Sequence, residues 1–188
     1  MRRGKDEMSK KLYRVLVPVL ALAVALTAVA VAGGATASKK APKKATEMTD
    51  GKVQFKVNKF FKEGYHFHEG KITIASGGTL RLIEKTGEDH TFSLVAKQPK
   101  TLKAANNCFG PTGVCGPILA AHGATEDGPP TNPLVNVGAD GFDQPGDSVI
   151  LPAKSKNTKV TITAKAGTRL KFMCVFHPQM QGVITVKK

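Results

Sequence analysis

The chain has 188 residues, few aromatic side chains and no tryptophan, and its formal net charge is +14 at pH 7. Residues 1–37 hold only six of the 28 basic and two of the 14 acidic side chains, so the remainder is strongly basic. This charge favours an acidic protein, an anionic lipid or a wall polymer as partner. Nucleic acid is excluded as the expected partner because the lysines are scattered, with no helix or aromatic platform to read bases.

Residues 1–37 are predicted to be an export segment. Six basic residues precede 23 uncharged residues, Val15 to Ala37, which keeps the N-terminus in the cytoplasm and exports the rest of the chain. Ala35-Thr36-Ala37 fits a cleavage site before Ser38, but the apolar stretch is also long enough to span a bilayer. Residues 15–37 are therefore a removed signal peptide or a retained membrane anchor. Either way the domain is expected to be extracytoplasmic: secreted, periplasmic or held at the cell surface.

Residues 38–50 contain Lys, Ala, Pro and Thr without apolar periodicity and are predicted to be a basic flexible linker. Residues 51–188 are predicted to form the single folded domain. Apolar and polar residues alternate there in short runs separated by Gly, Asn and Asp, a pattern typical of an all-β sandwich or barrel. The expected strands are 53–57, 71–75, 79–85, 91–96, 159–164, 168–173 and 183–187.

Residues 98–148 interrupt this pattern with an irregular insertion rich in Gly, Pro, Asn and Asp. Leu102–Ala105 and Ile118–His122 are each predicted to form a short helical turn. Cys108 and Cys115 are the natural disulfide pair for an oxidising compartment, and closing so short a loop contributes roughly 2–3 kcal/mol on the chain-entropy model. We therefore expect a loop insertion stapled by this disulfide.

Cys174 is the odd cysteine, and an unpaired thiol in an exported protein needs an explanation. His177 and Met180 come after it within seven residues, which concentrates thiolate, imidazole and thioether ligands. His90, at a turn between two predicted strands, would complete a set of two nitrogens, one strong sulfur and one weak axial sulfur. That set is diagnostic of a blue-copper electron-transfer site. The alternative for Cys174 alone is a buried, inert small residue.

The stretch Cys174-Val175-Phe176-His177-Pro178-Gln179-Met180 resembles the ligand loop of the cupredoxins, the small blue-copper proteins, and is most similar to that of amicyanin. Residues 65–74, residues 77–82 and His90-Thr91-Phe92 are similar to the strand pair and the first histidine of the same family. The resemblance covers roughly 53–95 and 149–188 and leaves the insertion outside. It implies an eight-stranded Greek-key sandwich of the plastocyanin type, a single type 1 copper and one-electron transfer.

Carried over residue by residue, the resemblance implies His90 and His177 as equatorial ligands, Cys174 as the thiolate and Met180 as the long axial ligand. The carbonyl of Asp89 would be a distant fifth contact. His177, Pro178 and Gln179 would frame the exit of the electron and the docking surface. The sequence departs from the family at Glu84 and Thr91, where asparagine is common, and at Val175, where a hydrogen-bonding residue is common.

Other metal and catalytic interpretations fit these residues less well. Structural zinc sites rarely use methionine. A dinuclear copper centre needs a second cysteine in the loop, and a multicopper oxidase needs His-x-His pairs. A Cys174–His177 catalytic pair leaves Met180 without a role, so we expect no enzyme. His66 and His68 are expected to be exposed strand residues, the alternative being an auxiliary metal or proton site with His122.

The sequence therefore predicts a monomeric, extracytoplasmic carrier with one copper ion that cycles between Cu(I) and Cu(II). Its partners would be redox proteins with an acidic docking surface, and residues 15–37 would associate it with a membrane if they are retained. Two other functions stay open. One is copper binding or delivery without electron transfer, and the other is a basic polymer-binding module with a vestigial metal site.

Overall fold

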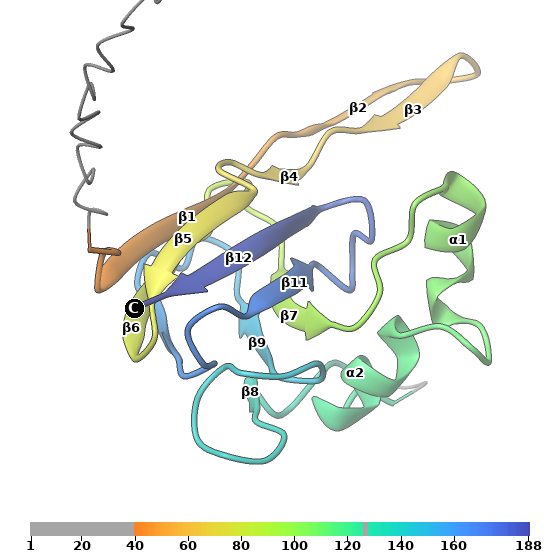
Figure 1. Ribbon diagram of the computed structural model, residues 1–188. Coiled ribbons are helices and arrows are strands. Elements are labelled where there is room, and N and C mark those ends of the chain that lie inside the picture. Colours follow the sequence, from red (N-terminus) through yellow and green to blue (C-terminus); the bar gives the residue numbers. More distant parts are fainter. Residues whose placement is uncertain (1–39, 126–127) are drawn as a thin grey trace, which may run out of the picture. The chain divides into compact units, whose positions relative to one another are not determined.

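Two β-sheets face each other across one hydrophobic core in the computed structural model, which describes residues 40–125 and 128–188 (Figure 1). The first sheet has the strand order β10-β6-β1-β4 and the second β5-β12-β11-β7-β9-β8. The chain passes repeatedly from one sheet to the other, as a Greek-key arrangement requires. The first sheet contains β1 (Lys44–Asp50), β4 (His66–Phe67), β6 (Gly78–Ile83) and β10 (Thr158–Ile162).

The second sheet is the larger one. The predicted ligand loop, Cys174–Met180, joins its strands β11 and β12. It contains β5 (Lys71–Ala75), β7 (His90–Val95), β8 (Leu134–Val135), β9 (Ser148–Leu151), β11 (Arg169–Met173) and β12 (Gln181–Lys187). Most neighbours are antiparallel, but β1 runs parallel to β6 and β12 runs parallel to β5. The predicted all-β sandwich is confirmed, although its two sheets hold ten strands in the described residues and the resemblance implied eight. Each of the seven predicted strands has a counterpart, and that of 53–57 lies outside the two sheets.

The hydrophobic core follows from the alternation of inward and outward side chains along the strands. In β5 and β12 every second side chain points inward, and the inward set is apolar. Phe67, Phe92 and Phe172 meet at the centre, with ring centroids 4.4 to 5.8 Å apart. Cys174 and Met180 belong to this same cluster, so the ligand loop is anchored in the core at one end of the sandwich.

The prediction of a flexible linker at 38–50 is wrong over Lys44–Asp50, which forms β1 between β4 and β6. The two fully buried positions of this strand, Glu47 and Thr49, are polar, so the alternation of hydrophobicity that marks other strands is missing. Glu47 is buried, and its carboxylate accepts hydrogen bonds from the backbone N–H groups of Met48, Glu69 and Gly70 at 2.9 to 3.1 Å. Burial raises the pKa of Glu47, against the effect of these hydrogen bonds.

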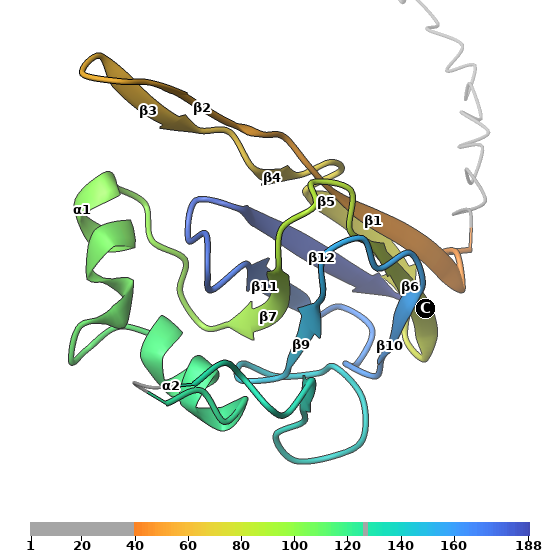
Figure 2. The same cartoon turned by 180° about the vertical axis from the view of Figure 1, so that it is seen from behind.

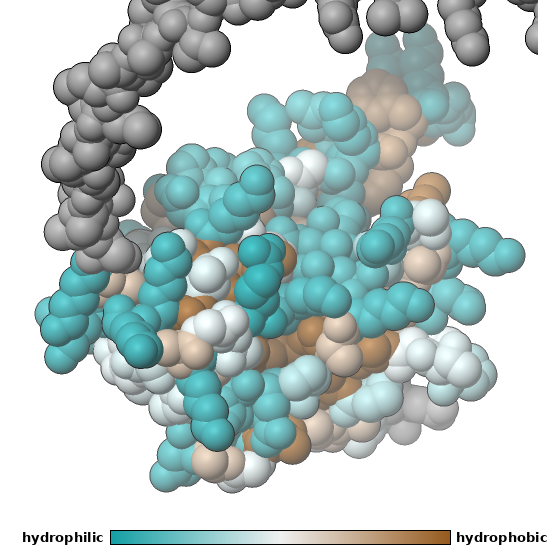
Figure 3. All heavy atoms as spheres, in the orientation of Figure 1, coloured by the Kyte–Doolittle hydropathy of each residue, from teal (hydrophilic) through white to brown (hydrophobic). Residues whose placement is uncertain are grey.

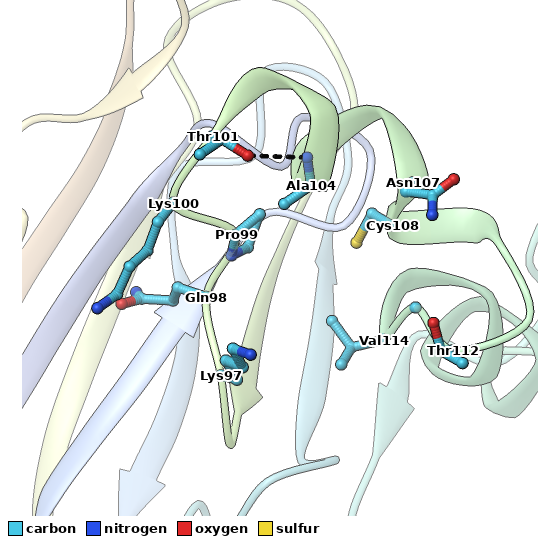
Figure 4. A pocket seen from close by; sticks show the side chains of 11 residues that line it. Lys97, Gln98, Pro99, Lys100, Thr101, Ala104, Asn107, Cys108, Thr112 and Val114 are labelled. Carbon is cyan, nitrogen blue, oxygen red and sulfur yellow. Dashed lines mark hydrogen bonds between the residues drawn. The ribbon is translucent and has the colours of Figure 1, made fainter.

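The insertion between β7 and β9 holds α1 (Leu102–Asn106), a 3-10 turn (Asn107–Phe109), α2 (Cys115–Ala121) and the short β8. Both predicted helical turns are confirmed. Thr101 caps α1 by accepting a hydrogen bond from Ala104 N at 3.1 Å, beside a pocket of about 460 Å³ (Figure 4). Gln98 fixes the start of the insertion by donating to the carbonyls of Phe172 and Gly182, both at 2.8 Å.

The predicted disulfide between Cys108 and Cys115 is confirmed. It lies in a second apolar cluster with Ile118, Met173 and Val175, directly behind the ligand loop. The disulfide is therefore buried and packs the insertion against the second sheet.

A third, two-stranded sheet consists of β2 (Val53–Lys56) and β3 (Phe60–Glu63), which project from the sandwich as a hairpin (Figures 1 and 2). The predicted signal or anchor over 1–37 lies outside the described residues. Within residues 40–125 and 128–188, no helix is long and apolar enough to cross a membrane.

Candidate metal centre

Three donor residues come from two neighbouring strands of the second sheet. His90 opens β7, and Cys174 comes directly after β11, which pairs antiparallel with β7. His177 lies in the loop that joins β11 to β12. His90 and Cys174 are completely buried, and the His177 side chain is 18% exposed. The fold thus brings His90 to the other two donors from more than eighty residues away.

The donor atoms form a compact triangle. His90 Nδ1 and His177 Nδ1 are 3.0 Å apart, and each is 3.6 Å from Cys174 Sγ. The centre of the circle through these atoms lies about 2 Å from all three, close to the distance at which imidazole nitrogen binds a transition metal. The triangle therefore has the size of a metal site, and this group could hold a metal ion.

The Nε2 atom of each imidazole faces an oxygen atom. His90 Nε2 is 2.7 Å from Thr86 Oγ1, and the Thr86 hydroxyl donates to the Glu84 carboxylate at 2.6 Å. Because that hydroxyl hydrogen is used on Glu84, its oxygen is free to accept from His90 Nε2–H. His177 Nε2 lies 3.2 Å from Glu63 Oε1. The hydrogen bond at His90 Nε2 leaves the Nδ1 lone pair of His90 for a metal, the usual arrangement around ligating histidines. Glu63 Oε1 makes no hydrogen bond, so the carboxylate acts on His177 by its charge at short range.

Glu84 holds the loop before His90. Its carboxylate accepts from the backbone N–H groups of Thr86, Gly87 and Lys154 and from the Thr49 hydroxyl. Burial raises the pKa of Glu84, but these hydrogen bonds outweigh burial and the net pKa lies below its ordinary value. A carboxylate that binds many donors thus stands where cupredoxins commonly have asparagine.

Thr91 connects the two ligand segments. Its backbone N–H donates to Cys174 Sγ at 3.3 Å, and its hydroxyl oxygen accepts from Val175 N at 2.8 Å. Thr91 therefore supplies the hydrogen bonds between the ligand strands even though Val175 has no polar side chain. A hydrogen bond to the sulfur also stabilises negative charge on it, as a thiolate ligand needs.

A buried chain of hydroxyl groups runs from Thr91 to His122. Ser93 Oγ is 2.9 Å from Thr91 Oγ1 and 2.7 Å from Ser148 Oγ, which is 2.7 Å from His122 Nε2. His122 Nδ1 is 2.6 Å from the Asn132 carbonyl and donates to it. His122 is thus a hydrogen-bonded core residue that ties the insertion to the ligand strands.

Met180 and the Asp89 carbonyl are the two further ligands that the sequence predicts. Met180 is completely buried, its carbonyl accepts from Cys174 N at 3.0 Å, and its N–H donates to His177 O at 2.8 Å. The loop from Cys174 to Met180 is therefore closed by its own backbone. The Asp89 carboxylate accepts from Ala153 N at 2.7 Å. The roles of Met180 and of the Asp89 carbonyl as axial ligands stay predictions.

Burial dominates the electrostatics of the donors. Burial and the neighbouring His177 lower the pKa of His90 to about 4. Burial also lowers the pKa of His177, against the field of Glu63 and Glu88. Burial raises the pKa of the Cys174 thiol. Burial thus favours neutral imidazoles that are ready to bind, and a metal would have to displace the proton of the Cys174 thiol.

Two features near the site had no sequence signal. Tyr65 is buried edge-on against both imidazoles, with ring centroids 5.2 Å from His90 and 4.9 Å from His177. Glu63 reaches His177 from the projecting hairpin, far from either ligand segment in sequence.

His66 and His68 are not among the donor residues. His66 contacts the Gly64 carbonyl at 3.1 Å, and exposed His68 lies 3.8 Å from Asp50.

The ligand loop opens onto a groove of about 1030 Å³ between the hairpin and α1. Pro178 and Gln179, the predicted docking residues, line it together with Phe176 and the exposed side chains of Phe61 and Leu102. His177 itself does not line the groove, but Glu63, which contacts it, does. The predicted docking residues Pro178 and Gln179 thus lie in a groove between the hairpin and α1.

Neither a protein-family model nor a curated protein matches the chain. Solved structures similar to it include reduced auracyanin from the photosynthetic bacterium Roseiflexus castenholzii, with 16% identity, a TM-score of 0.43, and coverage of 79% of this chain and 100% of that chain. A purple cupredoxin from Nitrosopumilus maritimus has 12% identity, a TM-score of 0.37, and coverage of 76% and 99%. Plastocyanin from Dryopteris crassirhizoma has 16% identity, a TM-score of 0.30, and coverage of 76% and 99%.

These proteins are of the kind that the ligand loop and the first histidine resemble in sequence. The TM-scores are all below 0.5, and the chemistry of the site follows from its own geometry. That geometry offers two neutral imidazole nitrogens and one sulfur around a single point in a buried, hydrogen-bonded pocket.

Proposed function

We propose that the chain is an extracytoplasmic type 1 copper protein that transfers single electrons between redox partners. The observation that carries the proposal is the triangle of His90 Nδ1, His177 Nδ1 and Cys174 Sγ. Two imidazoles and one thiolate in a trigonal set, with a methionine nearby, suit copper better than zinc. Met180 closes the same loop and would be the weak axial ligand, with the Asp89 carbonyl as a distant fifth contact.

Bound copper would supply a one-electron couple between Cu(II) and Cu(I). The chain's own part is to hold the ligands in place. Glu84 and Thr86 fix the orientation of His90 through hydrogen bonds, and Thr91 joins Cys174 to the neighbouring strand. Backbone hydrogen bonds within the ligand loop hold its shape. Ligands held so firmly change little between oxidation states, which favours rapid transfer.

Burial distinguishes electron transfer from copper delivery. His90 and Cys174 are 0% exposed, and Tyr65 covers both histidines. A delivery protein must pass its metal to an acceptor, and an enclosed donor set opposes that exchange. Copper binding or delivery without electron transfer is the alternative function. No fully exposed candidate ligand in the described residues favours it.

The export and partner proposals rest on separate observations. The disulfide between Cys108 and Cys115 suits an oxidising compartment, and the uncharged stretch at 15–37 suits export. The basic surface favours acidic redox partners that dock as transient complexes on a monomer at His177, Pro178 and Gln179. Their association rate is expected to fall as ionic strength rises. A rate that is insensitive to salt would contradict the electrostatic part.

The test is the visible absorption and EPR spectrum of the chain after addition of Cu(II), compared with Cys174→Ser. An intense blue band with narrow copper hyperfine splitting, absent from the variant, is the expected result. A pale Cu(II) spectrum that the substitution leaves unchanged would refute the type 1 site. Met180→Leu tests the axial ligand, because its removal should keep the blue band and alter the reduction potential.

A further inference from the structure

The β2–β3 hairpin is the most unusual surface of the molecule. It pairs with no other strand in the described residues and projects beyond the sandwich (Figures 1 and 2). An isolated two-stranded hairpin is marginally stable in water, and it needs another surface to cover its apolar side chains. The proposed electron transfer makes no use of its outer half.

Large apolar side chains are concentrated at the end of this hairpin. Phe55 is 71% exposed, Val57 74%, Phe60 52% and Phe61 70%. Four of the eight exposed large hydrophobic residues in the described chain thus lie within seven positions. Hydrophobic and hydrophilic atoms mix along the projecting hairpin at the upper right of Figure 3. Contiguous exposure of this kind marks an interaction site.

The strand register places these side chains on both faces of the ribbon. Phe55 is paired with Phe61, and the next pair is Lys56 with Phe60. Because successive side chains of a strand point to opposite faces, Phe55 and Phe61 lie on one face and Phe60 on the other. A protein groove would cover one face of the ribbon. Immersion in a lipid interface covers both faces and the tip.

The charge of the hairpin selects the lipid. The segment 51–62 contains Lys52, Lys56, Lys59 and Lys62 and no acidic residue. Lysines interleaved with phenylalanines suit the boundary between headgroups and acyl chains, where the rings enter the apolar layer and the ammonium groups contact anionic headgroups. An anionic bilayer therefore complements this surface in both charge and hydrophobicity.

We propose that the β2–β3 hairpin inserts its tip into the interface of an anionic lipid bilayer. Glu63, at the base of the hairpin, contacts His177, so insertion would hold the ligand loop at a fixed distance from the membrane surface. The proposal does not require a bound metal.

The experiment uses the absence of tryptophan from the chain. Phe55→Trp and Phe60→Trp each place a single indole on one face of the hairpin of the full chain. Leu134→Trp, at a site 47% exposed on β8, is the matched control away from the hairpin. Each protein is mixed with vesicles of phosphatidylcholine and phosphatidylglycerol, with or without brominated acyl chains, and with vesicles of phosphatidylcholine alone.

A blue shift and bromine quenching at both hairpin positions, but not at position 134, are expected on the anionic vesicles. Because the reporters are local, membrane binding through residues 15–37 alone leaves them unshifted. Lys56→Gln and Lys59→Gln should each lower the ratio of inserted to exposed indole about fivefold.

Three results would overturn the proposal. Emission of an exposed indole at both positions on anionic vesicles would exclude insertion. An equal shift on phosphatidylcholine alone would exclude the anionic requirement. A shift that appears without lipid as protein concentration rises would assign the surface to a second copy of the chain.

Discussion

Replacement of Glu63 by glutamine tests whether the hairpin tunes the metal centre. Glu63 Oε1 lies 3.2 Å from His177 Nε2, and the two side chains are only 27% and 18% exposed. A carboxylate at this position favours a proton on Nε2 and makes Nδ1 a better donor to Cu(II). Substitution of such a partner typically lowers metal affinity about 10- to 100-fold, or about 1.4–2.7 kcal/mol.

The loss should be larger for Cu(II) than for Cu(I), because the extra charge on the oxidised ion gains more from the carboxylate. Each tenfold difference between the two losses raises the reduction potential by about 59 mV. The assay is a competition titration of Cu(II) together with a potentiometric titration of the blue band. Glu88→Gln is the matched control, since Glu88 is exposed and acts on His177 through its field without contact.

A potential and a Cu(II) affinity that are the same in Glu63→Gln and wild type would refute this reasoning. Equal changes in Glu63→Gln and Glu88→Gln would show that the general field, and not the contact, is responsible. Thermal unfolding of each metal-free variant checks that the fold is retained.

The remaining predictions concern stability, measured by urea unfolding of the metal-free protein. The pKa of His90 is about 4 when folded and 6.5 when exposed, so the unfolded state binds a proton first as pH falls. Stability should therefore drop by about 3 kcal/mol between pH 6.5 and 4; a slope that persists in full in His90→Gln would contradict this assignment. Thr91→Val removes the acceptor of Val175 N and should cost about 1–3 kcal/mol, with Thr46→Val on the exposed side of β1 as control. An equal loss of stability in Thr91→Val and in the control would contradict a stabilising role for the hydrogen bond between Thr91 and Val175. Joint substitution of Cys108 and Cys115 by serine should cost about 2–3 kcal/mol and lower Tm by about 5–10 °C. Unchanged melting would mean that the staple is dispensable.

The sequence by itself determined the features that depend on local pattern. Alternation in segments such as Lys71–Ala75 specifies a strand because one face must be apolar. Cys174, His177 and Met180 lie in one short loop, so their proximity is a consequence of chain length. The cysteines at 108 and 115 are close enough in sequence that pairing is the simplest outcome, and the structure contains that bond.

Only the tertiary structure decided how polar residues are used in the interior. The sequence of β1 resembles a linker because its buried positions hold Glu47 and Thr49, whose hydrogen-bond partners lie on other segments. The contact of Glu63 with His177 and the series of hydrogen bonds from Thr91 to His122 likewise could not be predicted from the sequence pattern. A buried polar side chain is stabilised by partners from distant segments, and periodicity carries no information about those partners. The sequence therefore proposed the donor residues, and the fold decided which partners hold them.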